Sequence, residues 1–504
     1  MDKKWEEYRK AIAFLYILLV LALLPLWLLG ALASRVRQLW NPGAPSSGGY
    51  FSAPDFFAAA FAVVSCLSYL FSSYKNTAFW GYPGWYMGLF TQLSLAGGYF
   101  LVSRWHEKGK VLPACVWLSS FAVCLTGVLN RLGQDPLHVY EDMAWWEWNR
   151  RNLLSTIGNI NWFCSYLTVA APLLLYGFWA ASGFRRLAAG AGAFVGCAVL
   201  LLQGSSSGYA ALAAMLAVLL YGSLKDMFLF RRFLETAMLV ALFGFLMWLF
   251  QIGVLLPDDV SYWYTPLWGV VLLPLAGMWL LQAVCARNGR DFLKSGRVRK
   301  GAVFTGIVIL AAAAALFAGC QLWDGLWEFF GSRGFLRFNE EWGSMRGQLW
   351  TIAWQGFREA GLGRQLYGVG PDCFALYFYE NYPMDIVASG QWQDAVYANA
   401  HNEWLNMLIN EGILGLAAYM GFFGTAFWRF GRRHEENPGL MAGMMAVAAY
   451  GVNQLFSFGQ AVSTPQIFLV IGICENMCRT MDSDKEGKWE NTKGRMEIKD
   501  GNGG

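Results

Sequence analysis

Long uncharged apolar runs recur along this 504-residue chain, and they limit what it can fold into. A run of about 18 or more such residues can cross a bilayer as a helix. Inside a bilayer, only helices and closed barrels satisfy their own backbone hydrogen bonds. The composition agrees, because 56% of the residues are hydrophobic and only 14% are charged, whereas a soluble domain has about 25% charged residues. We therefore predict an all-α, polytopic membrane protein.

Counting the runs predicts about 12–13 transmembrane helices. The predicted spans are 11–33, 54–73, 82–102, 112–130, 157–180, 187–203, 206–223, 233–254, 263–284, 301–322, 404–428, 439–457 and 462–478. Lys and Arg gather in short connections between spans, and such loops prefer the cytoplasm. If these connections lie in the cytoplasm, the segment 323–403 lies on the extracytoplasmic side of the membrane. The orientation of the N-terminus stays open, because three early spans precede the first of these connections, whereas an internal N-terminus requires an even number.

The predicted organisation has four parts. They are an N-terminal transmembrane bundle at 1–322, a large extracytoplasmic loop at 323–403, C-terminal transmembrane helices at 404–478 and a disordered cytoplasmic tail at 479–504. The loop is far longer than a connection requires, which is typical of functional loops. Its many aromatic residues argue for ordered structure.

Two helices are predicted within this loop. "RGQLWTIAWQGFREAG" places Arg346, Trp350, Ala353 and Phe357 at helical spacing, as in an amphipathic helix. A shorter helix is predicted around 374–379.

Three features near the loop together suit a phosphate group. Arg346 offers a fork of donors to phosphate oxygens. Gly368 and Gly370, in "LYGVGPDCF", predict a tight turn with exposed N–H groups. His401 heads the apolar helix that follows, and helix N-termini attract anions. Its imidazole can donate a hydrogen bond or accept a proton near neutral pH.

The helix after His401 carries further signals. His401 shares one face with Leu405, Leu408, Gly412 and Gly415, and the small residues allow a neighbouring helix to approach closely. Glu411 lies at membrane depth, where a charge is costly, so we expect it to pack against a polar partner.

Each candidate also has a purely structural interpretation. His401 can serve as a cap or interface histidine, Arg346 can snorkel to lipid head groups, and the two glycines can simply form a turn.

Three elements, in this order along the chain, resemble the O-antigen ligase-related family. They are Arg346 with Trp350, then Gly368-Val369-Gly370 with Phe374, then His401-Asn402 with Leu405, Glu411, Gly412 and Gly415. The resemblance is strongest across residues 340–428. It implies a membrane glycosyltransferase of the GT-C type that acts in cell-surface polysaccharide biosynthesis. Such an enzyme takes glycan from an undecaprenyl-diphosphate carrier on the outer face of the cell membrane. It passes the glycan to a glycan, lipid or protein acceptor, with no cofactor, metal or nucleic acid.

By the same resemblance, Arg346 and His401 are the expected catalytic residues. The residues expected at the donor diphosphate are Arg346, Gly368, Gly370, Asn402 and Ser207. Many members carry an arginine where this chain has Ser207, which can hydrogen-bond a phosphate but cannot neutralise it. The substitution leaves both a ligase and a polymerase open. It also leaves open whether Arg333, Arg337 or Arg364 supplies the charge.

The alternative is a multi-span transporter or flippase for lipid-linked glycan. Such proteins often show internal repeats and ionisable residues in broken helices at mid-membrane. This sequence shows no pair of matching halves, and its polar residues gather in one outer loop. The sugar, the acceptor and the oligomeric state stay open.

Overall fold

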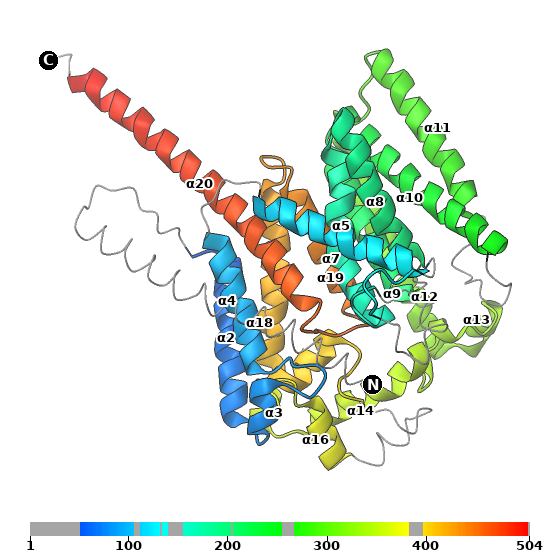
Figure 1. Ribbon diagram of the computed structural model, residues 1–504, viewed down its shortest axis with the longest axis vertical. Helices are drawn as coiled ribbons and strands as arrows, with labels where there is room; N and C mark the ends of the chain where they lie inside the picture. The colour runs from blue at the N-terminus through cyan, green and yellow to red at the C-terminus, as the bar shows by residue number, and fades with distance from the viewer. Residues whose placement is uncertain are drawn as a thin grey trace.

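The computed structural model describes residues 51–104, 111–131, 134–139, 155–202, 205–254, 267–382 and 397–501. All regular structure across these ranges is helical (Figure 1). The predicted span at 11–33 lies outside them.

Eight helices in the described ranges are long and apolar enough to cross a membrane. They are α2 (Ala53–Phe71), α7 (Ile160–Ala180), α8 (Phe184–Leu202), α9 (Ser206–Ser223), α10 (Met227–Val254), α11 (Leu267–Arg287), α12 (Arg297–Leu322) and α18 (Glu403–Arg433). Four more helices coincide with predicted spans, namely α4 (Leu89–Arg104), α5 (Val111–Arg131), α19 (Leu440–Asn453) and α20 (Thr464–Gly501). The prediction of an all-α polytopic membrane protein is confirmed.

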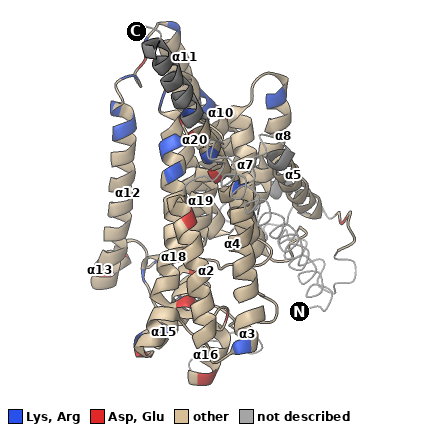
Figure 2. Ribbon diagram, turned by 90° about the vertical axis from the view of Figure 1, so that its left-hand side faces the viewer, with Lys and Arg blue, Asp and Glu red and all other residues tan. Residues whose placement is uncertain are grey.

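The bundle is built by helices far apart in the sequence. α2 packs along α18, α4 along α20, and α19 lies between α7 and α9 (Figure 1). Their shared core includes Phe163, Met215, Phe422, Met445 and Phe468. By contrast, α12 stands apart from the bundle in Figure 2 and exposes its apolar side chains, as a lipid-facing helix does.

A second, smaller core lies at one end of the bundle, between α12 and α18 in the sequence. The chain between α12 and α18 forms α13 (Asp324–Phe329), the 3₁₀ turn η2 (Gly334–Leu336), α14 (Trp342–Glu359), α15 (Leu362–Tyr367) and α16 (Phe374–Asn381). Neither α13 nor η2 contributes a residue to this core. Leu349 and Ala353 of α14 pack with Phe374 and Phe378 of α16 and with Ile409 of α18. The predicted amphipathic helix is therefore α14, and the predicted shorter helix is α16.

An ion-pair network ties the helices together elsewhere in the bundle. It joins α2, α4, α18 and α20 through Asp55, Arg104, Arg429, Arg433, Glu475, Arg479 and Asp482. Several charges buried together need such mutual pairing.

The prediction of a disordered tail at 479–504 is wrong for its described part, because α20 continues as a helix to Gly501. Asp482 pairs with Arg429 at 3.2 Å and also with Arg433 of α18, and Lys485 pairs with Glu436 at 2.7 Å. These contacts anchor the turns that follow the apolar part of the helix.

Candidate functional site

The second core brings Arg346 and His401 together. Trp350 lies one turn after Arg346 on α14, and its Nε1 donates a hydrogen bond to the carbonyl oxygen of Ala400 at 3.0 Å. Ala400 directly precedes His401. The guanidinium of Arg346 lies close enough to act on the imidazole of His401 electrostatically. Two residues that are 55 positions apart in the sequence therefore share one location.

His401 is held in place just before α18 begins. Its backbone N–H donates to Asn399 Oδ1 at 3.0 Å, and its ring lies edge-on to Phe458 with centroids 5.1 Å apart. Asn402 caps the helix by accepting the N–H of Leu405 at 3.1 Å. Asn402 therefore has a structural role at the position where the sequence suggests a ligand contact.

Burial, and secondly the charge of Arg346, lower the pKa of His401 to about 4. The imidazole is therefore neutral at pH 7 and can donate one hydrogen bond and accept another. An anion placed between the two side chains would reverse the effect of Arg346 and raise this pKa.

Arg346 has no acidic partner among the described residues. Its Nη1 donates to the carbonyl oxygen of Gly343 at 2.6 Å, while its buried Nε has no hydrogen-bond partner there. Burial lowers the pKa of Arg346. By comparison, Arg337 pairs with Asp324 at 2.7 Å, and Arg364 lies over the ring of Tyr377. A partly desolvated guanidinium with a free donor is suited to binding an anion.

Unusual backbone conformations gather around this location. Met345 (φ 69°), Asp372 (φ 57°) and His401 (φ 49°) all adopt left-handed conformations that non-glycine residues seldom adopt. Such strain persists only where surrounding contacts enforce it, and it concentrates at functional sites.

The glycine turn has a different role from the predicted one. The N–H of Gly368 donates to the carbonyl oxygen of Arg364 at 2.8 Å, and that of Gly370 to Asn410 at 3.0 Å. The prediction of exposed N–H groups at these two glycines is therefore wrong. The amide of Gly368 caps the end of α15, and the amide of Gly370 closes the turn onto α18.

This closure occurs where α18 breaks. Gly412 has φ 72° and ψ −173°, so the helix is interrupted there. A Cβ at Gly412 would overlap the carbonyl of Leu366, and a Cβ at Gly368 would overlap that of Asn410. The two backbones touch directly, and the contact fixes α15 and the turn against α18.

Glu411 and Gly415 pack inside the bundle. Glu411 is fully buried and faces Gln92 of α4 and Ser65 of α2. A Cβ at Gly415 would overlap the side chain of Glu411. Gly415 therefore makes room for the carboxyl group within its own helix.

Ser207 is buried in α9, with its Oγ 2.9 Å from Ser205 Oγ and 3.6 Å from Cys164 Sγ. No contact in the described part of the chain connects it to Arg346 or His401.

Asp372 is a structural residue of the site that sequence reasoning missed. Its Oδ2 accepts the N–H groups of Tyr82 and Met87 at 2.8 and 2.9 Å, which ties the 81–88 loop to the glycine turn. Burial raises the pKa of this carboxyl to about 7, although the hydrogen bonds from Met87 and Tyr82 act in the opposite direction. Its position directly after Gly-Val-Gly-Pro is the one sequence feature that could have indicated a role in this turn.

This pKa predicts a pH-dependent stability. An exposed aspartate has a pKa of about 3.9, so folding raises the value, and the stability from Asp372 is lost as the pH rises from about 4 through 7. We expect Asp372→Asn, which stays neutral and can still accept both hydrogen bonds, to gain in melting temperature relative to wild type between pH 5 and pH 8. Asp324→Asn is the control, because the Asp324 side chain is 73% exposed. An unchanged difference across this pH range would contradict the assignment.

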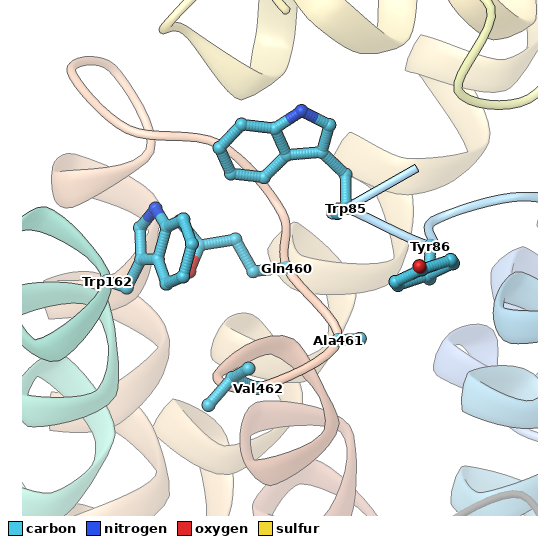
Figure 3. Close-up of a pocket in the computed structure, with 7 residues that line it drawn as sticks. Trp85, Tyr86, Trp162, Gln460, Ala461 and Val462 are labelled. Carbon is cyan, nitrogen blue, oxygen red and sulfur yellow. The ribbon is translucent and has the colours of Figure 1, made fainter. Parts of the chain in front are cut away.

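A narrow crevice lies beyond Phe458, lined by Trp85, Trp162 and Gln460 (Figure 3). The ring of Trp85 is 4.9 Å from Phe458 and 5.3 Å from Trp162. Gln460 is 3% exposed, and neither its Oε1 nor its Nε2 has a hydrogen-bond partner among the described residues. The free volume of about 10 Å³ admits one water-sized group.

Glu403 holds the crevice against the start of α18. Its Oε2 accepts the N–H of Gly459 at 2.7 Å, and its own N–H donates to the carbonyl oxygen of Gln454 at 2.9 Å. The segment that carries Phe458 and Gln460 is therefore fastened next to His401.

Fold and site together define a multi-span helical membrane protein. At one end of its bundle it has an arginine with no acidic partner among the described residues, a neutral histidine and an aromatic crevice. No group of three His, Cys, Asp or Glu side chains that could hold a metal occurs in the described ranges. A family model described as O-antigen ligase matches residues 265–420, which include Arg346, the glycine turn and His401. This match supports an O-antigen ligase-related family of glycan-transferring ligases and polymerases for this part of the chain. No curated protein matches the chain.

Proposed function

We propose that this protein transfers glycan from an undecaprenyl-diphosphate carrier to a glycan, lipid or protein acceptor on the outer face of the cell membrane. The observation that carries the proposal is that the guanidinium of Arg346, beside the neutral imidazole of His401, has no acidic partner among the described residues. A diphosphate between them supplies the anion that Arg346 lacks.

In this mechanism, an acceptor hydroxyl oxygen attacks the anomeric carbon of the donor sugar. A new glycosidic C–O bond forms while the bond between that carbon and the diphosphate breaks, and negative charge develops on the leaving diphosphate. Arg346 stabilises that charge through donors held in place before the reaction. His401, neutral at pH 7, accepts the proton that the hydroxyl loses. The narrow crevice beyond Phe458 admits one hydroxyl-sized group of a sugar, next to the side chain of Gln460.

The direct test uses the purified protein in vesicles, with a synthetic undecaprenyl-diphosphate-linked glycan and a glycan acceptor. We expect a lengthened or transferred glycan together with free undecaprenyl diphosphate. Movement of intact donor between leaflets, without cleavage of its glycosyl bond, would instead support the flippase alternative.

Gln460 provides a finer prediction. A sugar hydroxyl can both donate and accept a hydrogen bond, so it can pair with the Nε2 or the Oε1 of Gln460, which have no partner among the described residues. We expect Gln460→Leu to raise KM for the glycan substrate by about tenfold, the effect of one lost hydrogen bond. The variant should melt at an equal or higher temperature, because an unpaired buried amide costs stability.

The matched control is Gln454→Leu. Gln454 is also fully buried, and its side-chain amide has no hydrogen-bond partner in the described part of the chain, but it does not line the crevice. It should share the thermal effect and leave KM unchanged. Equal kinetics for wild type and Gln460→Leu would remove the crevice from the substrate site.

A further inference from the structure

A second cavity lies beyond the other end of α18. It has a volume of about 180 Å³ and is lined by Trp179, Ala180, Gly222, Lys225, Phe228, Leu229, His434, Glu435, Pro438 and Met441. His401 and His434 flank the 31 residues of α18, which puts them on the order of 45 Å apart. The cavity therefore cannot belong to the Arg346–His401 site.

His434 presents an unpaired nitrogen in this cavity. The residue is 6% exposed, and its Nδ1 lies 2.7 Å from the carbonyl oxygen of Gly431. Since a carbonyl only accepts, Nδ1 carries the proton and Nε2 is left as an acceptor. Nε2 is buried and has no hydrogen-bond partner in the described part of the chain. A ligand here must offer a donor.

Two charges of opposite sign line the same cavity. Lys225 and Glu435 are 3.5 Å apart, and both side chains are about two-fifths exposed. Arg299 reaches Glu435 from outside at 3.2 Å. An exposed ion pair of this kind contributes little to stability. It is available to a ligand that carries both signs.

The remaining walls are apolar and continue towards the outside of the bundle. Leu229 and Met441 line the interior, and Phe228 is 63% exposed at the start of α10. The Nε1–H of Trp179 donates a hydrogen bond to Ser223 Oγ at 3.0 Å, so Trp179 presents only its apolar ring to the cavity. A ligand with a charged head and an apolar tail matches this distribution of groups.

We propose that the cavity binds the head group of a zwitterionic aminophospholipid. The primary ammonium donates to Nε2 of His434 and to the carboxylate of Glu435, while the phosphate accepts from Lys225. The acyl chains lie along Phe228. Choline head groups have no N–H to donate, and glycerol head groups have no cation for Glu435.

The test compares lipids that differ only in N–H donors. The full-length protein is reconstituted in nanodiscs with equal amounts of phosphatidylethanolamine, its N-monomethyl and N-dimethyl forms and phosphatidylcholine, all with the same acyl chains. Phosphatidylglycerol is included in a parallel mixture. Lipid retained after detergent exchange is counted by mass spectrometry. We expect retention to fall with each added methyl group, with the ethanolamine lipid retained at least tenfold more than the choline lipid.

Two variants assign the effect to the cavity. His434→Leu removes the acceptor, and Glu435→Gln removes the charge at a partly exposed position where folding is not at risk. Each should reduce the preference for ethanolamine about tenfold, as expected for one charge-assisted hydrogen bond. Glu436→Gln, at the neighbouring position that pairs with Lys485, and His401→Ala should both retain it. Equal retention of all lipids, a preference for phosphatidylglycerol, or wild-type behaviour of Glu435→Gln would overturn the proposal.

Discussion

Replacing Arg346 with alanine should lower glycan transfer by about 10²–10³-fold, the effect of removing one fixed donor from a developing oxyanion. Arg346 lies beside His401 and has no acidic partner among the described residues, and its buried Nε has no hydrogen-bond partner there. The substitution therefore breaks no ion pair in the described part of the chain. Removal of the side chain should leave folding intact. Arg346→Lys should recover only part of the activity, because an ammonium cannot provide a bidentate fork.

The measurement is product formation from the lipid-diphosphate donor at saturating acceptor. Arg358→Ala is the matched control, since Arg358 is an exposed arginine on the same helix. His401→Gln should also lose most of the activity, because an amide can hydrogen-bond but cannot act as a base at neutral pH. Wild-type transfer by folded Arg346→Ala and His401→Gln would eliminate this site.

The second large effect is expected on folding, at Gly412. Its conformation, with φ 72° and ψ −173°, lies in a region that is nearly exclusive to glycine. A Cβ there would also overlap the backbone of Leu366. We expect Gly412→Ala to destabilise the protein by about 3 kcal/mol or more, by adding backbone strain to steric overlap. A large fall in melting temperature and in the yield of monodisperse protein would show this.

Gly424→Ala is the control within the same helix. A Cβ at Gly424 meets nothing within 4 Å, and its backbone is helical. Alanine is the better helix former by about 1 kcal/mol, so this variant should match or exceed the wild type. If Gly412→Ala and Gly424→Ala melted alike, the direct backbone contact between α15 and α18 would be wrong.

Sequence patterns predicted the helices well, because apolar length and spacing are local properties. α14 follows the spacing of Trp350, Ala353 and Phe357, and α16 begins at Phe374. The break in α18 was not predicted, because Gly412 also fits a continuous helix. Only the approach of Leu366, 46 residues earlier in the chain, gives that glycine its conformation.

The site shows the same division. Arg346 and His401 were identified from residue type and order, and the structure places them together. Gly368 and Gly370 were assigned to a phosphate because a glycine turn commonly exposes its N–H groups, but here those groups are taken by Arg364 and Asn410. No sequence pattern predicted a role for Gln460, because a glutamine in a short polar segment is common. Only the structure shows that its buried amide has no hydrogen-bond partner among the described residues.

The sequence by itself determined the membrane environment, the helical class and the resemblance to the ligase family, because each depends on composition or on the types and order of residues along the chain. The tertiary structure alone decided which amides stay free, which carboxyl is held as a buried acceptor at Asp372, and which histidine nitrogen is left without a partner at His434. Those properties depend on desolvation and on hydrogen-bond partners that come from distant parts of the chain, and packing alone brings such partners together.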